Sequence, residues 1–136
     1  MMREILFRGK RYDDGSWVEG YLIHDETCNT HIPYIGYLFD GGHDIDVAEI
    51  ILGTVGQFTG MSDKNGKKIF EGDAVRVSND YFCSDFVCRW DEPNIEFMLA
   101  NKHESFGLGY VAPYEVEVIG NIHDNPELVE VAEDGN

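Results

Sequence analysis

The chain has 136 residues, of which 43% are hydrophobic and 12% aromatic, so it has enough apolar surface to fold, as one ordinary domain or as two very small subdomains that share a core. It carries 26 Asp and Glu against 10 Lys and Arg, a formal net charge of −16. That balance disfavours direct nucleic-acid binding, because phosphate contacts need cations. The apolar runs, such as residues 50–52, are far too short to span a bilayer, so we expect no membrane role.

The first part of the chain predicts a β-hairpin. Residues 3–8 mix apolar and charged side chains as an early strand does, and residues 16–23 are rich in strand-favouring Trp, Val, Tyr, Leu and Ile. Between them, residues 13–15 read Asp-Asp-Gly, which is typical of a turn. The two runs therefore predict two paired strands.

Residues 31–39 predict the next strand. Pro33 has no backbone N–H, which indicates an edge strand or a strand start at that position. Residues 40–42, Asp-Gly-Gly, predict a turn after it. Asp46 and Glu49 fit one capped helical turn, but the Val and Ile around them fit a short strand equally well, and the pattern leaves both open.

The second half contains the strongest turn signal, Asn65-Gly66. Both residues accept positive φ, so the pair predicts a type I′ hairpin turn. Four further strands are expected from alternating or β-branched runs, at residues 71–78, 85–90, 94–99 and 115–122. These strands predict a small five-stranded, SH3-like barrel.

The end of the chain differs from the rest. Asn125 before Pro126 is typical of a helix start, so we expect a short helix there, followed by an acidic tail. The predicted fold is thus mostly β. Its parts are an N-terminal β-hairpin region at 1–56, a signature hairpin with an SH3-like barrel at 57–122, and the short helix and tail at 123–136.

Motifs for catalysis are missing from the sequence. Cys28, Cys83 and Cys88 have neither the count of a disulfide framework nor zinc-ligand spacing, and we interpret them as core or surface thiols. The histidines are isolated, and phosphate-binding, dinucleotide-binding and hydrolase motifs do not occur. We expect a non-enzymatic protein with no catalytic residue, cofactor or metal. The charged first segment does not resemble a signal peptide, so we expect a cytoplasmic protein.

Acidic residues gather in the middle of the first half. Asp40, Asp44 and Asp46 lie within a stretch from residue 12 to residue 63 that has no Lys or Arg. With His43 they predict a solvated acidic turn, the alternative being an adventitious divalent-ion site. We expect most of the aromatic side chains in the core and a few as exposed anchors for a protein interface. The aromatic residues considered are Trp17, Tyr21, Tyr34, Tyr37, Phe39, Phe58, Tyr81, Phe82 and Trp90.

Residues 55–73 resemble the signature of the YopX family. The pattern runs Gly-Gln-aromatic-Thr-Gly-hydrophobic, then Asp-Lys-Asn-Gly, then Ile-aromatic-Glu-Gly-Asp. Residues 3–8 are similar to the family's start and residues 119–128 to its ending, whereas residues 28–46 match no pattern of it. The resemblance implies a β-rich protein of phage or prophage type with no agreed active site.

The signature has a structural and a functional interpretation. In the first, Asn65-Gly66 makes a turn, the glycines permit tight backbone, and Glu71 or Asp73 bonds backbone N–H groups. In the second, the same loop is a binding surface. The candidate binding residues are Phe58, Thr59, Asp63, Asn65, Glu71, Asp73, Asp40, Asp44 and Asp46.

The sequence leaves three hypotheses for the function of the protein. The leading hypothesis is a protein-binding or self-assembling module, with homo-oligomerisation covering sheet edges. The first alternative is an acidic nucleic-acid mimic that inhibits a DNA-binding protein through the stretch without basic residues. The second alternative is a small enzyme of unassigned class.

Overall fold

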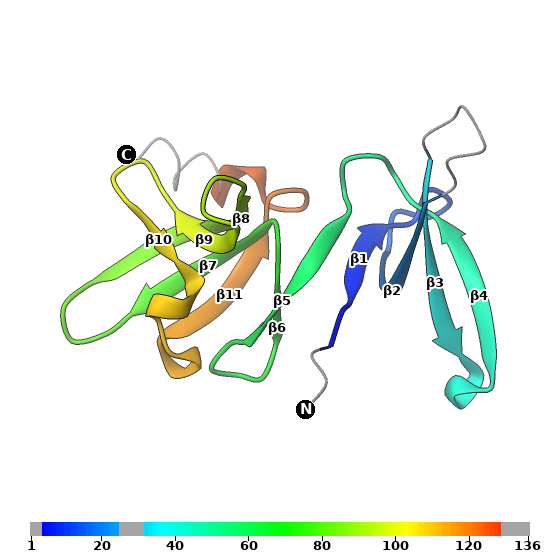
Figure 1. Ribbon diagram of the computed structural model, residues 1–136, viewed down its shortest axis with the longest axis horizontal. Coiled ribbons are helices and arrows are strands. Elements are labelled where there is room, and N and C mark those ends of the chain that lie inside the picture. Colours follow the sequence, from blue (N-terminus) through cyan, green and yellow to red (C-terminus); the bar gives the residue numbers. More distant parts are fainter. Residues whose placement is uncertain (1–3, 25–31, 129–136) are drawn as a thin grey trace. The chain divides into compact units, whose positions relative to one another are not determined.

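The computed structural model describes residues 4–24 and 32–128. By its internal contacts the chain divides into two compact units, Met1–Phe58 and Thr59–Asn136. The described residues form two antiparallel sheets, so the mostly β fold is confirmed (Figure 1). The three-part division drawn from the sequence stays a prediction. No helix among the described residues is long and apolar enough to cross a membrane.

The first unit is an antiparallel sheet in which the first four strands are neighbours in chain order and the fifth lies beside the first. Its order is β4-β3-β2-β1, followed by the start of β5. The strands are β1 (Phe7–Lys10), β2 (Trp17–His24), β3 (Pro33–Phe39), β4 (Asp44–Glu49) and β5 (Gly56–Ser62).

Tight turns join these strands where the sequence predicts them. Between β1 and β2 the Arg11 N–H donates to the Ser16 carbonyl at 2.8 Å, and Gly15 has a φ of 74°. Pro33 begins β3, which confirms the predicted strand start. A 3-10 turn, η1 (Asp40–Gly42), leads into β4, and β4 settles the ambiguity at Asp46 and Glu49 in favour of a strand.

The core of the first unit lies on one face of its sheet. Ile35, Ala48 and Ile50 are buried there, and Phe7 and Val18 pack against them. Glycine is needed at Gly9, because a Cβ would lie 2.5 Å from Cγ2 of Ile50. A Cβ on Gly20 would overlap the carbonyl oxygen of Gly36, so β2 and β3 also approach closely only through glycine.

The second unit contains a five-stranded antiparallel sheet with the order β10-β9-β8-β7-β11. The predicted SH3-like barrel is not confirmed, because the sheet is not closed and β10 and β11 are its edge strands. The elements are β6 (Lys68–Phe70), β7 (Asp73–Ser78), β8 (Cys83–Asp91), β9 (Glu96–Ala100), β10 (Ser105–Gly107), η2 (Leu108–Tyr110), η3 (Pro113–Glu115) and β11 (Val116–Asn121).

The core of this unit follows the predicted alternation. Val75 and Val77 are fully buried on β7, while Arg76 between them is exposed. They pack in one cluster with Phe86, Leu99 and other apolar side chains of the sheet. The expected C-terminal helix begins at Pro126 and is described as far as Leu128. The acidic tail lies outside the described residues.

Candidate functional site

The signature residues form the hairpin between β5 and β6. The Asp63 N–H donates to the Lys67 carbonyl at 2.7 Å, and the Gly66 N–H donates to the Asp63 carbonyl at 3.0 Å. Gly66 has a φ of 82°, whereas Asn65 does not have a positive φ. The predicted type I′ turn is therefore wrong, and the loop is a three-residue connection with Gly66 in the left-handed region.

Asp63 explains why the loop takes this shape. The carboxylate is 5% exposed and accepts the N–H groups of Asn65 and Lys67 on Oδ1 and that of Val118 on Oδ2, each at 2.9 Å. Burial alone would raise the pKa of Asp63, but the three backbone hydrogen bonds and the charge of Lys67 outweigh it and hold the pKa below its ordinary value. One carboxylate thus fixes the loop and ties it to β11.

The rest of the signature is also used inside the fold. Asp73, 1% exposed, accepts the Phe70 N–H on Oδ2 at 2.7 Å, as the structural interpretation expects. The Thr59 hydroxyl donates to the Ile69 carbonyl at 2.8 Å. The remaining candidates differ in exposure, and their binding role stays a prediction: Phe58 is buried, Glu71 is half-buried and Asn65 is exposed.

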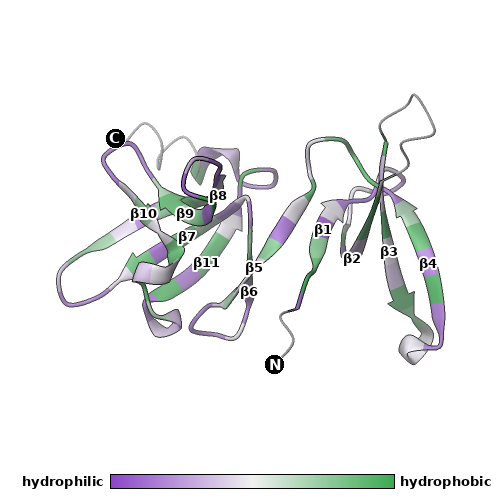
Figure 2. Ribbon diagram, viewed as in Figure 1, coloured by the Kyte–Doolittle hydropathy of each residue, from purple (hydrophilic) through white to green (hydrophobic). Residues whose placement is uncertain are grey.

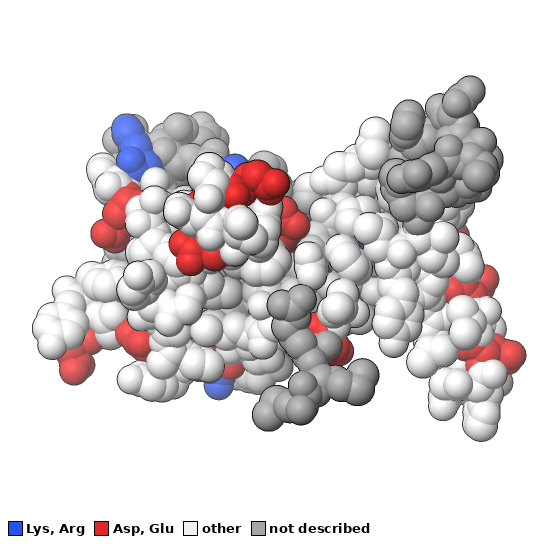
Figure 3. Space-filling model, viewed as in Figure 1, with Lys and Arg blue, Asp and Glu red and all other residues white. Residues whose placement is uncertain are grey.

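The acidic candidates belong to β4 and to the turn before it. Asp44 and Asp46 are exposed on β4, and the side chain of Asp40 lies outside the described part of the chain. Asp46 accepts the Tyr37 hydroxyl at 3.3 Å, and that hydroxyl in turn accepts Nη1 of Arg11 at 3.0 Å. Figure 3 shows red carboxylates gathered over the β3–β4 turn. Within residues 4–24 and 32–128, no group of three or more His, Cys, Asp or Glu could hold a metal ion.

The cysteines agree with their interpretation as core or surface thiols. Cys88 is fully buried in the core of the second unit, and Cys83 is exposed at the start of β8. Cys28 lies outside the described residues.

An exposed apolar surface, which the sequence did not predict, covers one face of β2, β3 and β4. The register pairs Tyr21 with Gly36 and Gly36 with Val47, and it pairs Leu38 with Ile45. Directly paired residues in an antiparallel sheet share a face, so these side chains lie together, opposite the core. We call this surface the apolar face, made up of Tyr21 (61% exposed), Ile23 (42%), Leu38 (56%), Ile45 (73%) and Val47 (50%).

Two features shape the apolar face. Gly36 at its centre has no side chain, and Cδ1 of Ile23 lies 3.2 Å from where a Cβ would be, so Ile23 covers the gap. Along β4, apolar residues on this face alternate with Asp44 and Asp46 on the other, which Figure 2 shows as interleaved green and purple. β4 is also one of the two edge strands of its sheet, and on its outer side the Glu49 carbonyl accepts the Tyr12 N–H and the Val47 N–H donates to Oδ1 of Asp46.

Charged residues border the apolar face unevenly. Glu19 and Glu49 share it and are exposed, and β2, β3 and β4 contain no Lys or Arg. Basic side chains occur only at the β1 end among the described strands of this face, where Arg8 lies over the Trp17 ring at 4.7 Å. A partner that covers the strands from β2 to β4 therefore meets carboxylates around an apolar centre.

The expectation that most aromatic side chains are in the core is wrong. Of the nine considered, Phe58 is buried, whereas Tyr21, Phe39, Tyr81, Phe82 and Trp90 are exposed. Strand composition favours aromatic residues on both faces of a sheet, and it does not tell which face is covered. The signal that could have indicated part of the apolar face is the alternation of acidic and apolar residues from Asp44 to Val47, which ends at Ala48.

Comparisons with known proteins identify a family and two solved structures that are similar to this chain. The sequence pattern of the family described as YopX protein matches residues 6–130. A crystal structure of protein EF1440 from Enterococcus faecalis is similar with a TM-score of 0.60 and 24% identity, covering 95% of this chain and 100% of that one. Protein yopX from Bacillus subtilis is similar with a TM-score of 0.56 and 19% identity, covering 92% and 95%. A comparison with curated proteins finds no match.

The match extends over nearly the whole chain, and the protein therefore belongs to the YopX family. The two solved structures are less than 25% identical to it and support the shared fold alone.

Proposed function

We propose that the protein is a binding module that docks a partner protein on the apolar face of β2, β3 and β4. The observation that carries this proposal is the gathering of five exposed apolar side chains on one side of a sheet whose other side holds the core. Contiguous apolar surface of this kind marks an interaction site more often than scattered single residues do.

The energy available from the face sets the strength of the interaction. Each side chain is about half exposed, so its burial by a partner contributes roughly 1 kcal/mol, and the five together about 5 kcal/mol. The entropy cost of association is of the same order or larger. Apolar contact alone is therefore not enough, and the partner must also make polar contacts at the charged rim of the face.

The charge at the rim selects the kind of partner. A second copy of this chain would oppose Glu19 and Glu49 to its own carboxylates, at a net charge of −16 per chain. A protein with Lys or Arg around an apolar patch would instead form opposite-charge pairs, which increase the association rate and add specificity. We therefore assign the apolar face to a different protein with a basic rim, in preference to self-assembly.

A matched pair of variants tests the proposal. Ile45 (73% exposed) lies on the apolar face, and Leu52 (76%) lies in the loop after β4 of the same unit. Immobilised wild type, Ile45→Asp and Leu52→Asp are incubated with lysate of Bacillus subtilis, the source of one similar protein, and bound proteins are quantified by mass spectrometry.

The proposal predicts a protein that wild type and Leu52→Asp retain equally and Ile45→Asp loses at least tenfold. Binding also weakens as salt rises, because the rim charges are screened. Equal retention by all three proteins contradicts the proposal, and so does wild type that sediments as a stable dimer through this face. Urea unfolding of each variant confirms that it is folded.

A further inference from the structure

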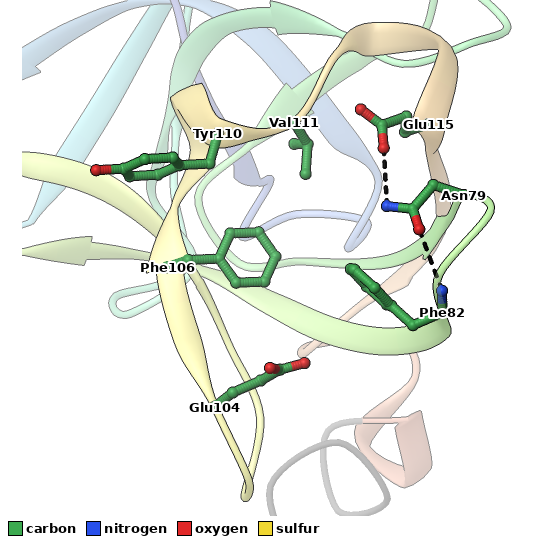
Figure 4. A pocket seen from close by; sticks show the side chains of 7 residues that line it. All are labelled: Asn79, Phe82, Glu104, Phe106, Tyr110, Val111 and Glu115. Atoms are coloured by element: carbon green, nitrogen blue, oxygen red, sulfur yellow. Dashed lines mark hydrogen bonds between the residues drawn. The ribbon is translucent and has the colours of Figure 1, made fainter.

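We propose that a cavity in the second unit is a socket for a cationic nitrogen group, an alkylammonium or a guanidinium. The cavity has a volume of about 210 Å³ and opens between the β7–β8 turn, β10 and the η2–η3 segment. It belongs to a different unit from the apolar face, so this inference does not depend on the proposed function. Figure 4 shows the side chains that line it.

The floor of the cavity is aromatic and anchored in the core. The rings of Phe82 and Phe106 both pack edge-on against the fully buried Phe86, with centroid distances of 6.4 Å and 5.0 Å. In Figure 4 the two rings point into the cavity together with Val111. Aromatic faces attract cations through their quadrupole, by about 0.5–2 kcal/mol depending on exposure.

Two carboxylates flank the aromatic floor. Glu115 is held in place, since Oε1 accepts the Ala112 N–H and Oε2 accepts Nδ2 of Asn79, each at 2.9 Å. These hydrogen bonds lower the pKa of Glu115, so its carboxylate is charged at neutral pH. Each oxygen has two lone pairs and uses one, so both can accept a further donor. Glu104 is exposed on the other side of the cavity in Figure 4.

The charged groups of the described lining are both carboxylates, Glu104 and Glu115, and its neutral polar side chains are Asn79 and Tyr110. The Asn79 amide is already engaged, because its oxygen accepts the N–H groups of Tyr81 and Phe82 and its nitrogen donates one of its two N–H groups to Glu115. Among the described residues, the lining contains no Lys, Arg or His. Lys102 and His103 precede Glu104 in the chain but do not line the cavity. A ligand that supplies donors and positive charge therefore fits, whereas an anion does not.

The size of the cavity limits the ligand further. Pockets for drug-sized molecules and cofactors have volumes of about 300–1,000 Å³, so a cavity of about 210 Å³ is too small for a nucleotide. It suits a single basic side chain of a partner protein or a small free amine. These two sources share one chemistry, the cationic nitrogen on an aliphatic stem.

The test uses amide chemical shifts of the full chain. Titrants are n-butylammonium, n-butylguanidinium and their neutral counterpart 1-pentanol, followed by pentapeptides with a central Lys, Arg or norleucine. We expect the cations to shift only the amide signals of residues that line the cavity, with a Kd of about 1 mM for the free cations. A peptide that binds tighter than its free cation assigns the source to a protein side chain, and equal affinity assigns it to a small amine; both outcomes support the socket.

Two Glu→Gln variants, one in the cavity and one outside it, provide the control. Glu104→Gln should weaken cation binding by about threefold, the range of an exposed ion pair. Glu127→Gln, an equally small change at an exposed residue outside the cavity, should leave it unchanged. Three results would overturn the inference: equal binding of pentanol, shifts spread over all acidic residues, or the same affinity for both variants.

Discussion

Asp63→Asn should destabilise the second unit strongly although it removes no volume. The new side chain has one oxygen, which can keep the N–H groups of Asn65 and Lys67, but its amide then faces the Val118 N–H. An unpaired, partly buried N–H costs about 1–3 kcal/mol, and the loss of charge from the other two bonds costs roughly 0.5–1 kcal/mol each. The sum is about 3 kcal/mol of unfolding free energy.

Urea unfolding of wild type and variant measures this loss. With a urea slope of about 1.5 kcal/mol/M, the midpoint should fall by about 2 M. Asp85→Asn is the matched control, because Asp85 pairs with Arg76 on the surface at 2.9 Å, where such a pair contributes about 0–1 kcal/mol. If Asp63→Asn loses no more than Asp85→Asn does, the carboxylate does not hold the loop and the reasoning is refuted.

Three further predictions concern stability and accessibility. The folded state lowers the pKa of Asp63 below its ordinary value of 3.8. The stabilisation that the carboxylate provides is therefore fully present above that pH and is lost as pH falls through the folded-state pKa. The urea midpoints of wild type and Asp63→Asn should converge only below about pH 4. Gly20→Ala should cost about 2 kcal/mol in thermal unfolding, because a Cβ overlaps a β3 carbonyl oxygen, whereas Gly109→Ala, with nothing within 4 Å, should cost almost nothing. Iodoacetamide should modify exposed Cys83 ~100-fold faster than buried Cys88, with the two rates measured by peptide mapping. Equal rates would contradict the burial of Cys88.

The strands were the predictable part of this structure. Alternation at Val75 and Val77, and turn residues such as those at 13–15 and at Gly66, act within a few residues and are visible in the sequence. The short β10 (Ser105–Gly107) was missed, because three residues carry no period. The number of strands favours an SH3-like barrel, but whether a sheet closes depends on which edge strands meet, and that is not a local property.

The candidate surfaces were less predictable. Asp63 is a candidate binding residue in the sequence because it belongs to the signature loop, yet its carboxylate reaches Val118, which is 55 residues away. The apolar face depends on the register that aligns Tyr21, Gly36 and Val47, and no local pattern specifies that alignment. Buried carboxylates and exposed apolar faces both arise from contacts between segments that are distant in the chain. The sequence gives the types of the residues involved, but it does not show which of them meet.

The most direct test of the docking proposal is site-specific photo-cross-linking. A benzophenone amino acid replaces Ile45 on the apolar face or Leu52 outside it, and each protein is irradiated in the same lysate. The account predicts an adduct at position 45 to one foreign protein, next to Lys or Arg residues of that protein, competed by excess wild type but not by Ile45→Asp. Adducts to a second copy of the chain, or equal adducts at both positions, would contradict it.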